Sequence, residues 1–299
     1  MRRLIIGSNG QVGRHLQHCF SDVDTVCIGR NDLDLDKPET VQRVLESYRP
    51  DVILNAAAYT QVDLAEVDAD AAYRVNRDAV FEMAQYASTH QALLVHYSTD
   101  YVFDGTKETP YSETDPTNPL SVYGDSKKHG DDAIQASGCQ HFIFRTSWVF
   151  SERGKNFPNT ILKLAHEREE LKVIYNQYGA PTHAQDIACV TSRILDIYHA
   201  SNQDERFSYN GIYNLTNLGS TSWHGFAKHL IDGAEIRGRQ LKCKADNIEP
   251  VASKSYNSVA RRPANSRLDC SKICKTFGLS LEFWFNSADK FLDVWNADD

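Results

Sequence analysis

Residues 4–13, Leu4-Ile5-Ile6-Gly7-Ser8-Asn9-Gly10-Gln11-Val12-Gly13, join a short apolar run to a turn that contains three glycines. The apolar run is typical of a buried strand, and a helix is predicted to follow over residues 12–20. Glycine allows backbone N–H groups to approach a ligand closely, and a helix N-terminus favours phosphate. The GxxGxxG spacing differs from the GxGxxG fingerprint. Its strand–turn–helix context nevertheless predicts a dinucleotide site.

The first half of the chain continues to alternate apolar runs with helical segments. Arg49-Pro50 ends one of these helices before the next strand begins. Strands that are apolar throughout and separated by helices indicate a parallel sheet covered on both faces. We therefore predict an α/β fold with a Rossmann-type doubly wound sheet. The predicted strands are 4–6, 25–28, 51–55 and 92–97, and the further predicted helices are 40–48 and 71–89.

After Trp148 the alternation loosens, which suggests a second unit. Helices are predicted over residues 157–168, 184–200 and 222–234, and a strand over 171–175. We expect a nucleotide-binding domain over residues 1–148, to which the chain returns around 183–201. Residues 149–299 are expected to form mainly a smaller, mixed substrate domain.

Composition excludes several classes of protein. The 299 residues carry a formal net charge of −8, which argues against a general nucleic-acid binder. No apolar run approaches the roughly 18–20 residues that span a membrane. The seven cysteines are scattered, and Cys270 and Cys274 lack a second pair, so reduced thiols in a cytoplasmic protein are expected rather than a zinc site.

Charge is uneven along the chain. Residues 237–275 hold ten Lys or Arg and three acids, which makes that segment +7 and the remainder −15. One interpretation is a solvated basic face. The other is a pocket for a phosphate-bearing ligand, because Arg pairs with phosphate through two hydrogen bonds.

The end of the second predicted strand bears on which dinucleotide is bound. An NAD site expects an acid there for the ribose 2′-hydroxyl, whereas a basic residue suits the 2′-phosphate of NADP. The chain has Ile28-Gly29-Arg30-Asn31 and then Asp32. Arg30 therefore favours NADPH, and the nearby Asp32 leaves use of NADH open.

A second motif, YxxxK, supplies candidate acid–base chemistry. Tyr123 and Lys127 are four residues apart and share one face of a helix. A lysine ammonium close to a tyrosine is expected to lower the pKa of the phenol from its usual value near 10. Thr99 follows the strand at 92–97, at the carboxyl end where parallel sheets bind ligands. The Thr99 hydroxyl can complete this group of catalytic side chains by hydrogen-bonding a substrate carbonyl.

Together these residues resemble the extended short-chain dehydrogenase/reductase family. The resemblance rests on the glycine turn, Asn55–Thr60, Ser98–Gly105 and Tyr123 with Lys127. Three more specific stretches resemble one branch of that family, the dTDP-4-dehydrorhamnose reductases, and the similarity spans nearly the whole chain. These stretches are Phe144–Phe150, Gln177–Thr182 and Arg262–Leu268.

The resemblance implies an oxidoreductase that uses NADPH to reduce the C4 ketone of dTDP-4-dehydro-6-deoxy-L-mannose to dTDP-L-rhamnose, for polysaccharide biosynthesis. By the same resemblance Tyr123 donates the proton, and Thr99 polarises the C4 carbonyl of the substrate. Lys127 modulates Tyr123 and binds the ribose of the cofactor. The implied cofactor-binding residues are Gly7, Gly10, Gln11, Val12, Arg30, Ala56, Ala57 and Ala58, with Tyr123 and Lys127. The implied substrate-binding residues are Thr60, Val62, Thr99, Asp100, Tyr101 and Trp148 around the sugar, and Asn156, Gln177, Arg262 and Asn265 near the nucleotide diphosphate.

The chain departs from some family members at the residues that hold a metal. Some family members pair through a metal held by acidic side chains, but here His15 and His183-Ala184-Gln185 stand at those places, so neither a metal-bridged dimer nor magnesium is expected.

Two rival functions also remain open. One rival is another nucleotide-deoxysugar 4-ketoreductase or epimerase–reductase. The other is a non-catalytic nucleotide-binding subunit of the methionine adenosyltransferase type, which the presence of Thr99, Tyr123 and Lys127 disfavours.

Overall fold

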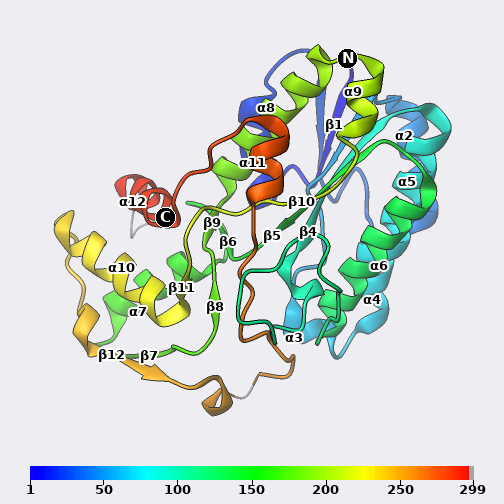
Figure 1. The fold of residues 1–299 in the computed structure, drawn as a ribbon. Coiled ribbons are helices and arrows are strands. Elements are labelled where there is room, and N and C mark those ends of the chain that lie inside the picture. The colour runs from blue at the N-terminus through cyan, green and yellow to red at the C-terminus, as the bar shows by residue number, and fades with distance from the viewer. Residues whose placement is uncertain (257, 296–299) are drawn as a thin grey trace.

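The centre of the protein is a six-stranded parallel sheet with the order β10-β5-β4-β3-β1-β2 (Figure 1). The computed structural model describes residues 1–256 and 258–295. The strands are β1 (Arg3–Ile6), β2 (Thr25–Ile28), β3 (Val52–Asn55), β4 (Leu93–Thr99), β5 (His141–Thr146) and β10 (Gly211–Asn214). The all-parallel order with helical crossovers confirms the predicted doubly wound α/β fold.

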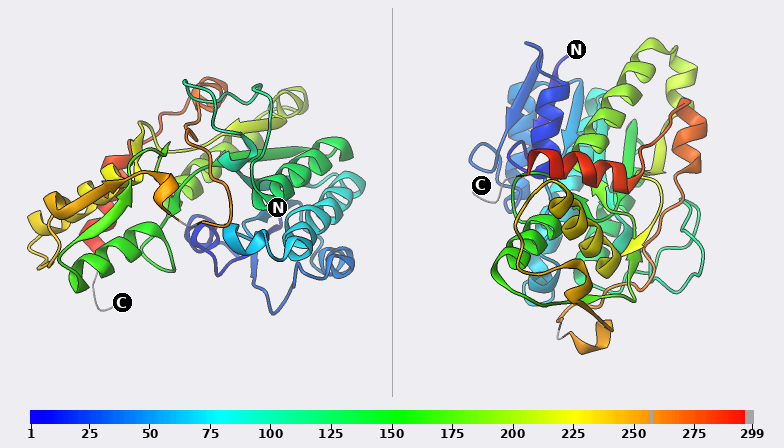
Figure 2. Two further views of the ribbon diagram at one scale, coloured as in Figure 1. Left: turned by 90° about the horizontal axis from the view of Figure 1, so that it is seen from below. Right: turned by 90° about the vertical axis from the view of Figure 1, so that its left-hand side faces the viewer.

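Helices cover both faces of this sheet, as the two turned views show (Figure 2). One face packs against α1 (Gln11–Cys19), α8 (Ala184–Ala200) and α11 (Ser271–Phe277). The other packs against α2 (Val41–Tyr48), α5 (Ala79–His90) and α6 (Val122–Ser137). Because β3, β4 and β5 are buried along their whole length, both of their faces need apolar cover, which explains why most of their residues are apolar.

The predicted helix over 71–89 consists of three joined pieces. They are α4 (Ala69–Tyr73), a π-helical turn (Arg74–Asp78) and α5. Inside the π turn, the Asn76 side chain accepts a hydrogen bond from Tyr59 N at 2.9 Å and donates to Tyr59 O at 3.1 Å. The wider turn therefore places a side chain that holds the loop after β3.

A second, smaller unit forms its own core beside the sheet (Figure 1). Phe226, Leu230, Phe291 and Leu162 are fully buried there. The unit contains α7 (Phe157–Glu167), α10 (Trp223–Ile236), α12 (Trp284–Val294) and the parallel pair β7 (Leu171–Ile174) and β12 (Ile248–Val251), with short elements β6 (Val149–Phe150), β8 (Tyr178–Gly179), β9 (Thr182–His183) and β11 (Thr221–Ser222) between them. Short connecting helices are α3 (Val62–Ala65) and α9 (Gln203–Ser208).

The chain passes back and forth between the two units. After Trp148 it returns to the first unit through α8, which packs against α1, and again through β10 and α11. The division near residue 148 stays a prediction. Besides the residues around 183–201 that were expected to return to the first unit, β10 and α11 return to it as well.

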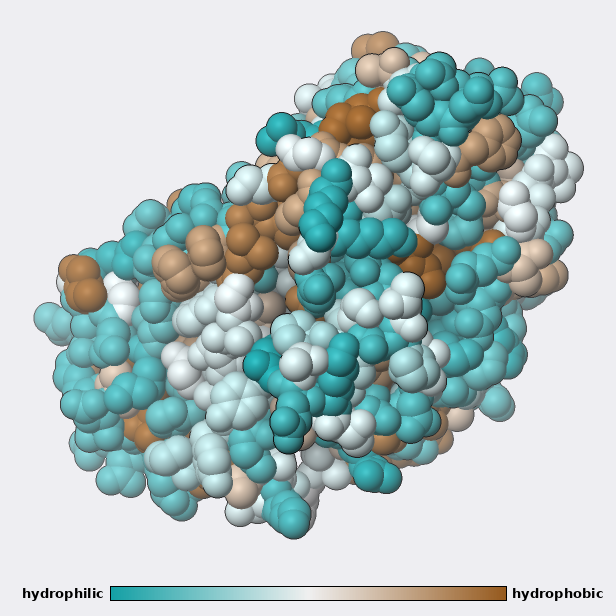
Figure 3. All heavy atoms as spheres, in the orientation of Figure 1, coloured by the Kyte–Doolittle hydropathy of each residue, from teal (hydrophilic) through white to brown (hydrophobic). Residues whose placement is uncertain are grey.

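The face of the molecule seen in Figure 3 is mostly hydrophilic, with hydrophobic residues in small separate patches. Among residues 1–256 and 258–295, no helix has the length and apolar character needed to cross a membrane.

The glycine turn depends on close packing that we expect a mutation to reveal. A Cβ at Gly13 would lie 2.2 Å from Gly7 O, whereas a Cβ at Gly10 would meet nothing closer than 3.2 Å. Gly13→Ala should therefore lower the free energy of unfolding by about 1–3 kcal/mol, the usual cost of overpacking. Gly10→Ala is the control with a smaller expected loss, and urea unfolding is the measurement. Equal stability of the two variants would contradict this packing argument.

Candidate active site

Strand β4 ends in a buried polar segment at the carboxyl edge of the sheet. Thr99 is its last residue, and a short 3-10 turn, Asp100–Val102, follows. The Thr99 hydroxyl accepts a hydrogen bond from Tyr101 N at 3.2 Å and donates to Asp100 Oδ1 at 3.1 Å. The hydroxyl thus has a fixed position at the carboxyl end of a central strand, where such sheets bind ligands.

Helix α6 brings Tyr123 and Lys127 to the same place. Ser121 caps this helix, since its Oγ accepts a hydrogen bond from Gly124 N at 3.2 Å. Lys127 is 1% exposed, and its Nζ donates to Tyr97 O at 2.7 Å. One turn earlier, the ring of Tyr123 packs edge-on against Tyr101 with centroids 5.8 Å apart. The three predicted catalytic residues therefore lie on adjoining elements.

A buried ion pair fixes the other end of the same helix face. Asp131 Oδ2 accepts a hydrogen bond from Ser98 Oγ at 2.8 Å and lies 3.4 Å from Arg145 Nε on β5. Asp131 is fully buried, and Arg145 is 4% exposed. Since Lys127 and Asp131 are again four residues apart, one face of α6 is anchored to β4 and β5.

The pKa of Tyr123 differs from the sequence-based expectation. Burial raises the pKa of Tyr123 to about 12, and only the hydrogen bond with Thr99 opposes the rise. Lys127 does not lower it, because its Nζ is engaged by Tyr97 O and His96. The expected lowering by lysine is therefore wrong for this geometry. The phenol is protonated at neutral pH, as a proton donor has to be.

Lys127 itself has an altered pKa and a neighbour that sequence reasoning missed. Burial lowers the pKa of Lys127 to about 8, although the charge of Asp131 opposes this. His96 Nε2 lies 2.9 Å from Lys127 Nζ, and its Nδ1 lies 3.1 Å from Asn55 Nδ2. Burial and then the Lys127 charge hold the pKa of His96 well below its usual value, so the imidazole is neutral.

Asp100 is a second buried carboxyl group at the site. Burial raises the pKa of Asp100 to about 7, although the nearby hydroxyls of Ser266 and Thr99 oppose the rise. Its Oδ2 has no hydrogen-bond partner in the part of the chain that the structure describes. A buried carboxyl oxygen without a partner, next to Thr99, requires an explanation.

The glycine turn has the geometry of a phosphate site. Gly7 has φ +79°, and a Cβ there would lie 2.7 Å from Ala57 N, so the turn and the loop after β3 are in close contact. The described residues place no side-chain cap on α1, whose N-cap is Gly10. Its first N–H groups, on Gln11 and Val12, are therefore available to a pyrophosphate. The predicted cofactor residues Ala56, Ala57 and Ala58 form the facing loop and are partly buried.

Arg30 lies beyond the end of β2 and is free to turn toward a ligand. Its side chain is 80% exposed, and its Nε lies 3.3 Å from Asp34 Oδ1. The Asp32 carboxylate instead accepts a hydrogen bond from Gly29 N at 2.9 Å. The structure thus leaves the basic residue accessible and uses the acid to shape the loop.

The residues predicted to surround a sugar are only partly gathered. Thr60 is exposed and Val62 begins α3. Trp148 has φ +48° and stacks on Trp223 with ring centroids 3.5 Å apart, so one face of its indole is already covered. Stacking of Trp148 on the sugar stays a prediction.

Of the residues predicted near the nucleotide diphosphate, two have evident local tasks. Asn156 caps α7, accepting from Asn159 N at 3.0 Å and donating to Gln11 Oε1 at 2.9 Å. The Asn265 amide donates to Lys107 O at 2.6 Å and Thr109 O at 3.0 Å. These bonds stabilise loops, so a ligand role would require them to break. Gln177 is buried, at 7% exposure.

Arg262 is the member of the basic stretch that lies beside the site. It binds Asp63 through Nη1–Oδ1 at 3.2 Å and Nη2–Oδ2 at 2.6 Å, and these contacts lower the pKa of Asp63. Other members lie elsewhere, such as Arg237 on Asp293 and Lys272 on Ile212 O. The stretch is therefore spread over several surfaces, which favours the solvated basic face over a single pocket.

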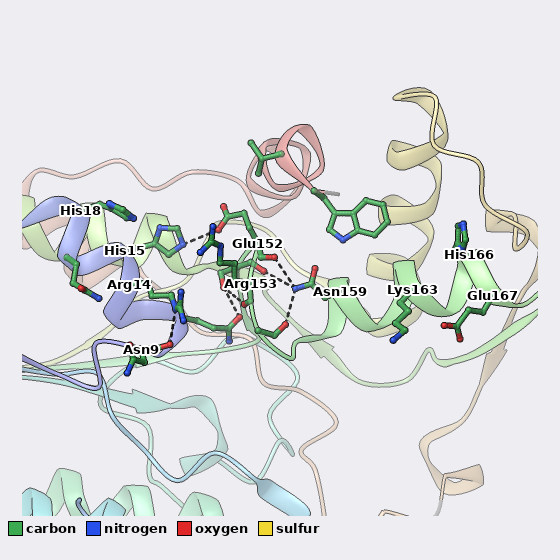
Figure 4. Close-up of a pocket in the computed structure, with 16 residues that line it drawn as sticks. Asn9, Arg14, His15, His18, Glu152, Arg153, Asn159, Lys163, His166 and Glu167 are labelled. Carbon is green, nitrogen blue, oxygen red and sulfur yellow. Dashed lines mark hydrogen bonds and ion pairs between the residues drawn. The ribbon is translucent and has the colours of Figure 1, made fainter. Parts of the chain in front are cut away.

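A large cleft of about 1350 Å³ lies to one side of Thr99, Tyr123 and Lys127. Figure 4 shows it between the start of α1, the loop after β6 and helix α7. Asn9 and Gln11 of the glycine turn line it, and the lining does not include Thr99, Tyr123 or Lys127. It adjoins the predicted pyrophosphate position but not the predicted reaction centre.

Comparison with known proteins places the chain among nucleotide-sugar enzymes. The family described as RmlD substrate binding domain matches residues 1–296. A dTDP-4-dehydrorhamnose reductase of Burkholderia thailandensis is 44% identical over 285 residues, 95% of each chain. A crystal structure of such a reductase from Clostridium acetobutylicum has a TM-score of 0.88 at 30% identity, and covers 98% of this chain and 99% of its own. One from Bacillus anthracis, in complex with NADP, has a TM-score of 0.87 at 32% identity and covers 98% of each chain.

The raised pKa of Asp100 predicts a pH-dependent stability. A folded-state pKa near 7, against about 4 in the unfolded chain, means that folding takes up a proton between these pH values. The contribution of Asp100 to stability therefore falls as pH rises from 4 to 7. Asp100→Asn removes this titration, so its stability relative to wild type should improve between pH 5 and pH 8 by more than about 1.4 kcal/mol, the equivalent of one pKa unit. Urea unfolding at both pH values measures this.

The exposed Asp132 provides the control for that measurement. Asp132→Asn removes a carboxylate of the same helix as Tyr123 without removing a buried one, so its effect should be small at both pH values. A pH-independent difference between wild type and Asp100→Asn would contradict a neutral buried Asp100.

Proposed function

The chain belongs to the RmlD substrate binding domain family, and on that premise we propose that it is the NADPH-dependent reductase that converts dTDP-4-dehydro-6-deoxy-L-mannose to dTDP-L-rhamnose. It is an NAD(P)H-dependent oxidoreductase like its relatives named dTDP-4-dehydrorhamnose reductase. The observation that carries the proposal is the joining of Thr99, Tyr123 and buried Lys127 at the carboxyl end of β4.

The nicotinamide, when bound, supplies a hydride to C4 of the sugar. Tyr123 Oη gives its proton to the C4 oxygen, which becomes a hydroxyl. The Thr99 hydroxyl donates a hydrogen bond to the same oxygen and polarises the C=O bond before transfer. Lys127 helps to hold Tyr123 in position, because its Nζ ties the same face of α6 to Tyr97 O on β4. Tyr123 and Thr99 thus act on the same oxygen atom.

Support for the cofactor side comes from the glycine turn and Arg30. Backbone N–H groups at the start of α1 suit a pyrophosphate, and the exposed Arg30 suits the 2′-phosphate that distinguishes NADPH from NADH. The NADP complex of the Bacillus anthracis relative accords with this preference. Lys127 would bind the nicotinamide ribose. Asp100, with its free carboxyl oxygen, would bind a sugar hydroxyl.

The direct test is NADPH consumption by purified protein supplied with dTDP-4-dehydro-6-deoxy-L-mannose made in situ. NADH and the GDP-linked keto-sugar are run in parallel, and the product is identified by mass and sugar analysis. We expect oxidation selective for the dTDP-sugar and formation of dTDP-L-rhamnose. Turnover of a different keto-sugar would move the proposal to another deoxysugar reductase. Cofactor binding without any turnover would favour the non-catalytic subunit.

Tyr123→Phe tests the proton donor. Removing the hydroxyl should lower kcat by about 100- to 10,000-fold, the range for a lost general acid, while the Kd for NADPH stays near the wild-type value. Steady-state kinetics and fluorescence titration of NADPH are the measurements. Tyr48→Phe, at the end of α2, removes a similar hydroxyl far from the site and should leave both unchanged. A Tyr123→Phe enzyme with wild-type kcat would contradict the assignment.

Arg30→Ala tests cofactor selection. Loss of the guanidinium removes a partner of the 2′-phosphate, so the KM for NADPH should rise by about 10-fold, the equivalent of one charge-assisted hydrogen bond. The KM for NADH should stay within a factor of two or so, since NADH lacks that phosphate. Arg43→Ala, an exposed arginine on α2, is the control. Equal changes for both cofactors would show that Arg30 does not read the 2′-phosphate.

A further inference from the structure

Three metal-ligating side chains from distant parts of the sequence meet beside the large cleft. His15 lies on α1, Glu152 in the loop after β6, and His183 at the start of α8. Glu152 lies between the two imidazoles, with Oε2 3.2 Å from His15 Nε2 and Oε1 3.0 Å from His183 Nε2. One donor atom from each residue lies within 4.8 Å of the other two. Figure 4 shows His15 and Glu152 pointing toward one another at the edge of the cleft.

The burial of these residues is unlike that of a surface ion pair. The side chain of His183 is 2% exposed, that of His15 16% and that of Glu152 28%. The His183 ring packs against Phe150, with ring centroids 5.0 Å apart, on the side of the small unit's core. Two imidazole rings and a carboxylate are thus held at the boundary between the two units with little freedom to separate.

His183 Nε2 is also an unsatisfied buried atom. It lies 3.0 Å from Glu152 Oε1, yet its geometry is not that of a hydrogen bond, and it has no other partner among residues 1–256 and 258–295. A buried polar atom without a partner requires an explanation. A ring nitrogen aimed at a carboxylate and a second imidazole suits a shared cation.

His15 and Glu152 line the cleft, so one side of the group faces it. The cleft also presents positive groups, namely Arg14, Arg153 and Lys163. Of these, Arg14 is turned away, since its Nε donates to Asn9 O at 3.0 Å.

We propose that His15, Glu152 and His183 form a binding site for a divalent transition-metal ion of the zinc class, with a fourth position open to water from the cleft. Zinc binds imidazole nitrogen and carboxylate oxygen at about 2.0–2.2 Å, so tetrahedral ligand atoms lie roughly 3.3 Å apart. The two measured separations are 3.0 and 3.2 Å. Two imidazoles and one carboxylate select zinc, cobalt or nickel, whereas magnesium and calcium prefer oxygen ligands.

The site is separate from the reductase chemistry and goes beyond the proposed function. It takes no part in hydride transfer, because its ligands are not among the residues at Thr99, Tyr123 and Lys127. Its position gives it a structural task. Ser151, next to Glu152, donates from Oγ to Gln11 Oε1 at 3.0 Å, and Gln11 begins the helix that carries His15. A bound ion would therefore clamp α1 and its glycine turn to the small unit.

Cobalt titration tests the site, since Co²⁺ reports its coordination by visible absorption. Untagged protein, stripped with EDTA and re-equilibrated, is titrated with Co²⁺, with Zn²⁺ in competition and with Mg²⁺ as a separate arm. We expect one Co²⁺ per chain with the intense bands of a four-coordinate ion, displacement by Zn²⁺, and no effect of Mg²⁺. Addition of Zn²⁺ should raise the melting temperature, because the ion binds only the folded arrangement.

Two variants and a control test whether these residues bind the ion. His15→Ala should weaken Co²⁺ binding at least 10-fold, the minimum cost seen even for outer partners of a metal site. Glu152→Gln keeps the shape of the side chain and removes its charge, and should do the same. His18→Ala changes the neighbouring cleft histidine on the same helix and should bind Co²⁺ like wild type. NADPH binding by each metal-free variant shows that the fold is intact.

Two results would contradict the proposed metal site. No Co²⁺ bands at excess metal would overturn the site and leave His15, Glu152 and His183 as a group of side chains in close contact without a metal. Equal affinity of wild type and His15→Ala would overturn it too, because the ion would then bind elsewhere. Neither result affects the reductase assay, which depends on Tyr123.

Discussion

The docking of one polar face of α6 onto β4 and β5 is the constraint on which the candidate active site depends. Lys127 and Asp131 are charged groups buried almost completely, and such groups are tolerated only when they are paired and hydrogen-bonded. Tyr97 O and His96 engage the lysine, while Ser98 and Arg145 engage the aspartate. Since these partners exist in one register only, α6 can neither rotate nor slide, and Tyr123 is held beside Thr99.

Close backbone contacts support that register from both sides. A Cβ at Gly124 would lie 2.2 Å from Tyr101 O, and one at Gly130 would lie 2.2 Å from Asn76 O. The first contact brings α6 against the turn that carries Asp100 and Tyr101. The second brings it against the π turn that holds the loop after β3. The same helix thereby organises the catalytic trio and the loops predicted to contact cofactor and sugar.

Sequence patterns predicted what is local and missed what depends on tertiary contacts. The strand–turn–helix at Gly7 to Gly13 and the pair Tyr123 and Lys127 are short-range, so spacing was enough to find them. His96 appears as one apolar-strand position among others, and only the fold brings it to Lys127. The pKa of Tyr123 was predicted in the wrong direction because burial outweighs a lysine that is engaged elsewhere. Asp131 offered a usable signal, since it is four residues after Lys127 on the same helix face.

A crystal structure of the protein with NADP and a dTDP-sugar bound would test the central claim most directly, namely that α6 holds the proton donor in place before substrate arrives. We predict Tyr123 Oη and Thr99 Oγ1 within about 2.6–3.2 Å of the sugar O4, nicotinamide C4 about 3–3.5 Å from the sugar C4, and the contacts of Lys127 and Asp131 with β4 preserved. A complex in which another group lies against O4, or in which α6 has moved to reach it, would contradict the account.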